Sequence, residues 1–333
     1  MMTTITFSNV YVKSRAAVAG PLEAQGPLKD LYDKTYDDNY CNEKSFEKAE
    51  RAMIYDACDT ALRKGNAKLS DLDVIVGGDL INQLTSSHYF ARDTQRPFIG
   101  MYAACATSSL VIGQAALWVE HHLAHEALAF TSSHANTAER QFRFPNEYGI
   151  QKKETTTFTV TGAGAILLSE RKSPIRVSAM TVGRIVDWDH TDANDMGIAM
   201  APAAYDTLMT HLNNTHTNFD DYDLIATGDL SKLGFSFLMD LLYQEHHNVH
   251  NHLHDCGLMI YDTQQQDVFC GGSGCACSMC VSMTKLLNDI ELGNLRRVMV
   301  IATGALLSPV AVQQKESIPC IAHAIVYERS EDQ

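Results

Sequence analysis

The chain has 333 residues, of which 45% are hydrophobic and 20% charged, a composition typical of a globular protein with a substantial core. The formal net charge of −14 argues against binding to nucleic acid, because no basic surface is available to displace counterions from phosphate groups. The nine cysteines, an odd number, lie mostly among apolar or small residues, which favours reduced thiols in the cytoplasm over a disulfide framework.

The N-terminal sequence MMTTITFSNV lacks the cationic start and the apolar run of a secretory signal. No segment reaches the roughly 18 consecutive apolar residues that a membrane-spanning helix requires. One of the longest apolar runs, residues 298–307, is interrupted by Thr303 and Gly304. We therefore expect a cytoplasmic protein that reaches a membrane only as a peripheral component.

The first clear helix follows a loop. Glycine-proline pairs at 20–21 and 26–27 break the chain after the first predicted strand, and the acidic segment 32–42 has no clear period, which predicts an ordered surface loop. Residues 45–64 are predicted to form a helix, with Ser45 as N-cap and Gly65 at the end. Apolar residues recur on one face at helical spacing. They are Phe46, Ala49, Met53, Ala57 and Ala61.

The strand pattern DVIVGGDL at residues 73–80 recurs as DLIATGDL at 223–230, which indicates an internal duplication. Three further similarities follow in the same order: CATS at 105–108 with CACS at 275–278, 128–130 with 298–301, and 164–168 with 323–327. Each half alternates strands and helices, as in a mixed sheet covered by helices. We predict an α/β fold of two duplicated halves, 1–172 and 173–333, that share one core.

Cys105 lies where a strand pattern ending in small residues gives way to a helix opened by Thr107 and Ser108. Backbone N–H groups and the helix dipole at such a position stabilise a thiolate or hold an anion. The sequence therefore predicts a nucleophile or part of an anion site. The structural alternative is a small buried cysteine that allows close packing of the strand and the helix.

The two tandem halves, with AACATS at residues 103–108 in the first, resemble the thiolase fold shared by thiolases and ketoacyl synthases. This resemblance implies a layered α-β-α-β-α core, a nucleophilic cysteine at position 105, and partners from the second half: a histidine with a second histidine or an asparagine. The matching segments, 225–234 and 270–278, contain neither residue type and offer Asp229, Gly272 and Ser273 instead. A carboxylate with an ordinary pKa near 4 is a poor base at neutral pH, so we expect the usual condensation chemistry to be lost.

Nearly the whole chain resembles one branch of this superfamily, the stage V sporulation protein AD family of spore-forming bacteria. The resemblance rests on long and unusual strings: LYDKTYD (31–37), TSSH (131–134), TAERQFR (137–143), MAPAA (200–204), GLMIY (257–261), GGSGCACS (271–278) and QQKESIPCIAH (313–323). It implies noncatalytic binding of dipicolinic acid, the pyridine dicarboxylate stored in spores, with no cofactor. It also implies membrane proteins of the same sporulation apparatus as partners, at the inner membrane of the forespore. Proteins of the thiolase fold commonly dimerise through edge strands near the cysteine turn, so a homodimer is expected by resemblance.

Dipicolinate is a flat aromatic dianion, so its site needs cationic or N–H donors at the carboxylates and apolar walls around the ring. The segment 134–143 offers up to three positive donors in His134, Arg140 and Arg143, and the helix N-terminus at Cys105 offers a place for the other carboxylate. The predicted ligand site comprises Cys105, Thr107, Ser108, His134, Arg140, Arg143, Asp229, Gly272 and Ser273. The alternative is that the two arginines form structural ion pairs with Glu139 and Glu147.

Two clusters have the composition of metal ligands. One comprises His246, His247, His250, His252, His254 and Cys256, and the other comprises Cys270, Cys275, Cys277 and Cys280. The cysteines contain a single Cys-x2-Cys pair and coincide with the repeat of the Cys105 turn, so we favour buried packing for them. We favour a solvated loop for the histidines and expect no metal, with His250, His252 and His254 as the weak candidates.

Three hypotheses follow from the sequence. The first is a noncatalytic dipicolinate-binding protein. The second is an acyl-transferring condensing enzyme in which Cys105 accepts an acyl group from a thioester with altered partners. The third is a scaffold whose pocket no longer has a role.

Overall fold

The computed structural model describes residues 3–247, 249 and 252–330. Their main feature is a 12-stranded mixed sheet whose two halves repeat one strand order. The strands of the first half, in spatial order, are β2 (Tyr11–Ala19), β8 (Gly162–Ser169), β6 (Glu126–Ser133), β4 (Val74–Gly78) and β5 (Phe98–Gly100). Those of the second half are β9 (Ile175–Val182), β14 (Cys320–Arg329), β13 (Arg297–Ala305), β10 (Leu224–Thr227) and β11 (Leu253–Asp255).

The halves join where β2 pairs with β9, and β1 (Thr4–Thr6) and β3 (Lys34–Thr35) add short edges to those two strands. All four similarities in the sequence fall on corresponding elements of the two halves: β4 and β10, the turns before α3 (Thr107–Glu120) and at the start of α8 (Cys275–Val281), β6 and β13, and β8 and β14. The predicted α/β fold with duplicated halves is confirmed. The division at residues 172 and 173 falls between β8 and β9 and stays a prediction.

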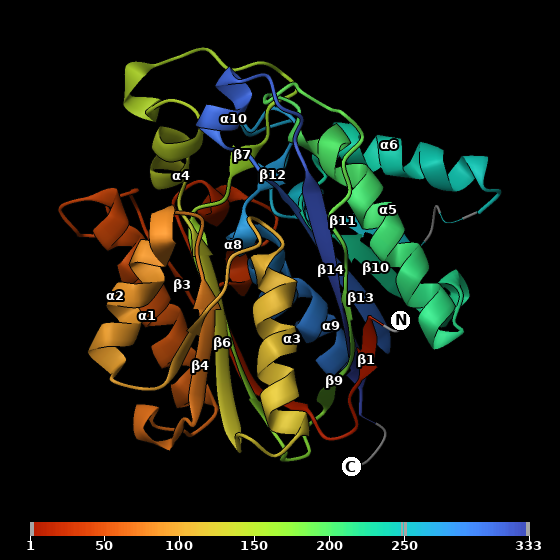
Figure 1. The fold of residues 1–333 in the computed structure, drawn as a ribbon. Coiled ribbons are helices and arrows are strands. Elements are labelled where there is room, and N and C mark those ends of the chain that lie inside the picture. Colours follow the sequence, from red (N-terminus) through yellow and green to blue (C-terminus); the bar gives the residue numbers. More distant parts are fainter. Residues whose placement is uncertain (1–2, 248, 250–251, 331–333) are drawn as a thin grey trace.

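The helices form three layers around the sheet, as Figure 1 shows. α1 (Phe46–Lys64) and α2 (Thr85–Thr94) cover the outer face of the first half, and α5 (Met196–Thr215) and α6 (Ser231–Gln244) cover that of the second. Between the halves lie α3, α8, a π-helical turn (Ser282–Leu286) and α9 (Leu287–Leu292). Within the described part of the chain, no helix combines the length and hydrophobicity needed to cross a bilayer.

Helix α1 confirms the sequence prediction in detail. Ser45 Oγ accepts a hydrogen bond from the backbone N of Lys48 at 3.4 Å, and Gly65 caps the other end. The five apolar residues predicted on one face are all buried against the sheet. The preceding segment 32–42 is irregular apart from the short β3, and it buries Tyr36 and Cys41.

The central helix α3 is apolar on nearly every side because it packs against strands of both halves. Val111, Ile112, Ala115, Ala116 and Val119 are buried in one cluster with residues of β4, β6 and β14. Cys105 lies just before this helix, so the architecture holds it at the junction of the two halves.

Candidate functional site

The turn that carries Cys105 is tightly constrained. Ala104 has a left-handed backbone with φ of 48°, an uncommon conformation for a residue with a side chain. The hydroxyl of Thr107 fixes the turn, because it donates to the carbonyl of Ala104 at 2.6 Å and accepts from the backbone N of Ala103 at 2.9 Å. On the β13 side, a Cβ on Gly304 would lie 2.3 Å from the carbonyl oxygen of Ala103. Only glycine at 304 allows the turn to approach the second half so closely.

Asp229, which follows β10, lies at the centre of a buried hydrogen-bond network beside Cys105. Its carboxylate accepts from Ser273 Oγ at 2.9 Å, from the backbone N of Gly274 at 3.1 Å and from Thr303 Oγ1 at 2.5 Å. The thiol sulfur of Cys105 lies 3.8 Å from Ser273 Oγ. The structure therefore brings together three predicted residues, Cys105, Asp229 and Ser273, from both halves of the chain.

This environment keeps the thiol of Cys105 protonated. Burial is the largest cause that raises its pKa well above the ordinary value, and the nearby Asp229 raises it further. Burial also raises the pKa of the Asp229 carboxyl. Burial and the neighbouring carboxyl therefore both disfavour a thiolate at this helix start.

Three other predicted residues support the site from outside. Thr107 holds the turn, and Ser108 Oγ bonds Ser278 Oγ at 2.6 Å, which ties α3 to α8 in the core. Gly272 lies on β12 (Gly272–Ser273), which pairs with β7 (Phe158–Thr159), and its carbonyl accepts from Ser231 Oγ at 2.9 Å. These residues position Cys105 and Ser273.

A narrow pocket of about 40 Å³ opens beside Cys105; we call it the inner pocket. Its walls include Leu80, Cys105, Phe142, Arg143, Met196 and Ser273. No histidine lines it in the part of the chain that the structure describes. A protonated thiol beside a hydroxyl can contact a ligand, and the carboxyl of Asp229 is the titratable side chain that lies against the thiol.

His134 and Arg140 do not reach this pocket. His134 is buried and is the N-cap of α4 (Ala135–Phe142): its Nε2 donates to the carbonyl of Asn39 at 2.8 Å, and its Nδ1 accepts from the backbone N of Asn136. Burial lowers its pKa to about 4, so it is neutral at pH 7 and offers no positive charge. Arg140 forms ion pairs with Glu47 at 3.2 Å and Glu147 at 3.7 Å.

Arg143 does line the inner pocket, and it is held by a buried carboxylate. Its Nη1 lies 2.7 Å from an oxygen of Glu139, whose other oxygen lies 3.2 Å from Lys152 Nζ. The Glu139 side chain is only 2% exposed. Nε of Arg143 is buried and has no hydrogen-bond partner among the described residues. This guanidinium therefore retains one N–H donor without a partner among the described residues.

A second, larger pocket of about 360 Å³ lies on the other side of Arg143; we call it the outer pocket. It shares Glu139, Phe142 and Arg143 with the inner pocket, so these three side chains separate the two spaces. Lys152 is a second cation in its wall, and the apolar part of the wall comprises Phe142, Phe144, Pro145, Ile150, Ala193, Pro309 and Val312. Its volume is within the range of about 300–1,000 Å³ that is usual for small-molecule sites.

The two candidate metal clusters have other environments. His252 Nδ1 is 2.9 Å from the carbonyl of Tyr222 and its Nε2 is 3.4 Å from Asp220, while burial lowers the pKa of His254. His250 lies outside the described residues. All four cysteines of the second cluster are buried free thiols. Across residues 3–247, 249 and 252–330, no group of three or more potential ligands could hold a metal ion.

Comparisons with known proteins agree on the family. The model of the family described as stage V sporulation protein AD (SpoVAD) matches residues 2–328. The chain is 49% identical over 321 residues to the stage V sporulation protein AD of Bacillus subtilis strain 168, which covers 96% of this chain and 95% of that protein.

Solved structures with the same fold are more distant in sequence. One is 3-oxoacyl-[acyl-carrier-protein] synthase III from Aquifex aeolicus VF5, with a TM-score of 0.60 and 11% identity over 96% of this chain and 99% of that one. Another is a variant of OleA from Xanthomonas campestris, with a TM-score of 0.61 and 13% identity over 97% and 99%. At this identity the likeness shows the thiolase-like fold alone.

Proposed function

The chain belongs to the stage V sporulation protein AD family, and on this basis we propose that it is a noncatalytic protein that binds dipicolinic acid for uptake into the developing spore. The observation that carries the noncatalytic part is the environment of Cys105, which is a protonated thiol beside Asp229 and Ser273 instead of an imidazole. In this proposal the protein acts as a homodimer without a cofactor, peripheral to the forespore inner membrane, with membrane proteins of the same apparatus as partners.

The outer pocket matches the chemistry of dipicolinate better than the predicted position at the start of α3. Arg143 and Lys152 are cations in its wall, and aromatic and aliphatic side chains provide the apolar surface that a pyridine ring needs. Arg143 also lines the inner pocket, so this cation lies between the outer pocket and Cys105. We place the ligand in the outer pocket, with its carboxylates at Arg143 and Lys152.

Calorimetric titration of the whole protein with dipicolinate tests the binding function. We expect saturable heat with dipicolinate. Picolinate has one carboxylate and can engage only one of the two cations, so we expect it to bind at least tenfold more weakly, because a hydrogen bond to a charged group contributes about 1.5–3 kcal/mol. Equal affinity for the two acids would contradict the two-cation site, and absence of saturable heat with dipicolinate would contradict the function itself.

The reactivity of Cys105 separates this proposal from an acyl-transferring enzyme. At pH 8 about a quarter of a free cysteine with a pKa near 8.5 is thiolate, whereas the raised pKa of Cys105 leaves far less of it ionised. We expect no stoichiometric adduct by intact mass after incubation with acetyl-coenzyme A at pH 7 to 8.5, and slower alkylation by iodoacetamide than of free cysteine. A stoichiometric acyl adduct that disappears in Cys105→Ala would favour the enzyme instead.

A further inference from the structure

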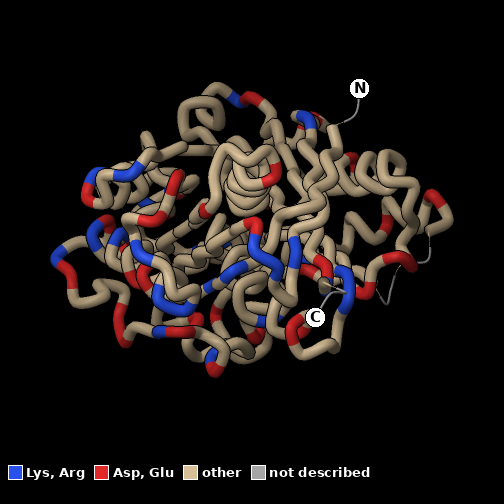
Figure 2. Tube along the Cα trace, turned by 90° about the horizontal axis from the view of Figure 1, so that it is seen from below, with Lys and Arg blue, Asp and Glu red and all other residues tan. Residues whose placement is uncertain are grey.

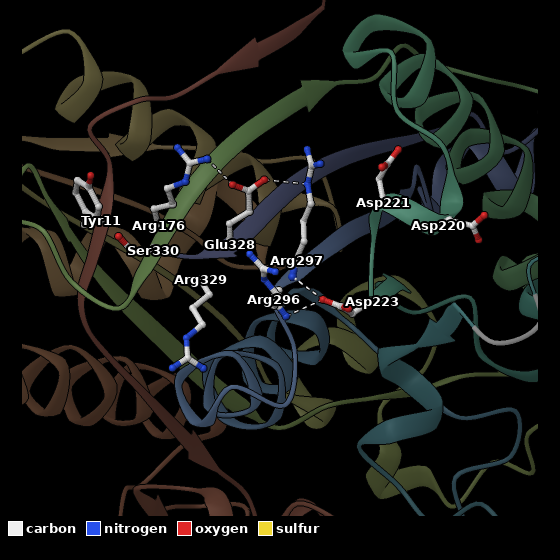
Figure 3. Close-up of a pocket in the computed structure, with 10 residues that line it drawn as sticks. All are labelled: Tyr11, Arg176, Asp220, Asp221, Asp223, Arg296, Arg297, Glu328, Arg329 and Ser330. Atoms are coloured by element: carbon white, nitrogen blue, oxygen red, sulfur yellow. Dashed lines mark hydrogen bonds and ion pairs between the residues drawn. The ribbon is translucent and has the colours of Figure 1, made fainter. Parts of the chain in front are cut away.

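Charged side chains near the C-terminus balance one another. Figure 2 shows acidic and basic positions interspersed around this end of the molecule. A pocket of about 600 Å³ lies here, and Figure 3 shows its lining. Arginines and carboxylates line it in equal number: Arg176, Arg296, Arg297 and Arg329 with Asp220, Asp221, Asp223 and Glu328. The pocket therefore favours no ligand of either charge.

Helix α6, at the edge of the molecule in Figure 1, combines an apolar line with a surplus of one charge. Its buried residues recur every three or four positions from Ser231 to Leu242. Beside them, Leu233, Phe237 and Leu241 follow one another at intervals of four residues, so they form a line of about 12 Å along the helix. Leu233 is 37% exposed, and the other two are half-buried.

Trp188 widens this line. It lies in the segment between β9 and α5 and is 57% exposed. Its ring meets that of Phe237 edge-on, with the centroids 6.3 Å apart. We call Leu233, Phe237, Leu241 and Trp188 the α6 stripe. An exposed tryptophan beside a row of apolar side chains is typical of a surface that another molecule covers.

The counterpart of α6 in the first half is α2, and its exposed aromatic residue is covered by cations of the same chain. The guanidinium groups of Arg51 and Arg92 lie 5.3 and 4.9 Å from the ring centroid of Tyr89. Among the described residues, no cation lies over the ring of Trp188 or Phe237. The second half therefore leaves open a position that the first half fills with arginine.

Carboxylates flank the α6 stripe. Asp240 lies on α6 one turn after Phe237, and Asp187 and Asp189 lie on either side of Trp188 in the sequence. Within the part of the chain that the structure describes, none of these three carboxylates has a cationic partner; Asp187 accepts from Ser317 Oγ at 2.6 Å.

The cations close to the α6 stripe do not offset these acids. Arg184 forms an ion pair with Asp206 at 2.6 Å, and Lys232 Nζ lies 3.4 Å from the carbonyl oxygen of Phe269. Lys315, two positions before Ser317, is followed by Glu316. The surface around the stripe is therefore negative as well as apolar.

From this geometry we propose that the α6 stripe is the docking surface for a partner protein that presents a basic amphipathic helix. The apolar face of such a helix would cover the line from Leu233 to Leu241, while its lysine or arginine side chains would meet Asp240 and the face of Trp188. A second copy of this chain is disfavoured, because it has a net charge of −14 and brings the same carboxylates. An anionic lipid surface is disfavoured for the same reason.

The docking surface lies beside the outer pocket without being part of it. Ala193 and Asn194, a few residues after Trp188, line the outer pocket. None of the four residues of the α6 stripe lines the inner or the outer pocket. The inference is therefore independent of dipicolinate binding, and the two proposals can fail separately.

Titration of the whole protein with a synthetic amphipathic helical peptide of leucine and lysine tests the docking surface. Calorimetry gives the affinity, and tryptophan emission reports the location. The chain has two tryptophans, and Trp118 is half-buried, so a shift of the emission to shorter wavelength that is absent in Trp188→Ala shows burial of Trp188. The same peptide with glutamate in place of lysine tests the requirement for positive charge.

We expect saturable binding of the lysine peptide that weakens at least about tenfold in Trp188→Ala, because tryptophans dominate the energetics of interfaces. Asp240→Asn should weaken it about two- to fivefold, as for an exposed ion pair. The matched controls are Leu292→Ala, at a residue 74% exposed at the end of α9, and Glu43→Gln, on the loop before α1; both should bind as the wild type does. Circular dichroism verifies that each variant is folded, and dipicolinate binding should be unchanged in Trp188→Ala.

The proposal is wrong if the lysine peptide does not bind saturably, if the glutamate peptide binds equally well, or if Trp188→Ala binds as tightly as Leu292→Ala. Two further results would assign the α6 stripe to another occupant and overturn the proposal as well. Flotation with phosphatidylcholine vesicles that depends on Trp188 would indicate a lipid surface. A dimer that dissociates in Trp188→Ala, measured by sedimentation, would indicate a second copy of this chain.

Discussion

Replacing Asp229 with alanine lowers the free energy of unfolding by about 3–5 kcal/mol, the expected result for a buried acceptor that serves several donors. The substitution leaves the hydroxyls of Ser273 and Thr303 and the backbone N–H of Gly274 without their acceptor, in a site with almost no access to water. The measurement is urea unfolding followed by circular dichroism, with the midpoint and slope determined for each variant.

Two further variants make this result specific. Asp229→Asn keeps one oxygen that accepts from Thr303, but it presents an amide N–H₂ group where the N–H of Gly274 needs an acceptor. The stability of this variant should therefore lie between those of the wild type and Asp229→Ala. Asp240→Ala, at an exposed position on α6, is the control and should change stability by less than about 0.5 kcal/mol. If Asp229→Ala matches Asp240→Ala, the network contributes little to the fold.

The fold could be predicted from the sequence because its signals are repeated. The duplication appeared in four short similarities, and each falls on corresponding strands or turns. Periodicity alone located α1, since a helix with one buried face repeats every three or four residues. The order of strands in space did not follow from these patterns, and the family resemblance implied only the layered core; the structure shows the order.

The site was predicted less completely, for two physical reasons. The protonation state of Cys105 depends on burial and on Asp229, 124 positions away in the sequence, whereas the local sequence contains only the helix start. The sequence also could not predict that the Arg143 side chain points into the two pockets while that of Arg140 does not. Arg143 follows the last residue of α4 with a nonhelical backbone, φ of −133° and ψ of −98°, so helical spacing cannot relate it to Arg140.

Glu139 and Lys152 were missed as site residues. The sequence suggested Glu139 only as an ion-pair partner of an arginine, and the structure shows that pair with Arg143. Lys152 comes from a segment without periodicity, between the 3-10 turn at Asn146–Tyr148 and β7, so no pattern could bring it to α4. Their shared contact is visible only once the loop is folded against the helix.

This contact leads to the prediction with the largest expected effect on binding. Arg143→Gln should weaken dipicolinate at least about tenfold and up to about 100-fold, because it removes a buried cation that faces both pockets. Glu139→Gln should strengthen binding about tenfold, because the carboxylate that now neutralises both Arg143 and Lys152 is lost and both cations are free for the dianion. Calorimetric titration gives the dissociation constant of each variant.

The opposite signs of the two changes separate a ligand site from a structural ion pair. Were the pair only structural, Arg143→Gln and Glu139→Gln would both reduce stability and neither would alter the affinity for dipicolinate. Arg140→Gln and Glu147→Gln are matched controls, since these residues pair with each other outside both pockets. They should bind dipicolinate as the wild type does. If Arg140→Gln weakens binding as much as Arg143→Gln, the ligand lies nearer to Glu47 and Glu147 than to the outer pocket, because Arg140 contacts those two residues.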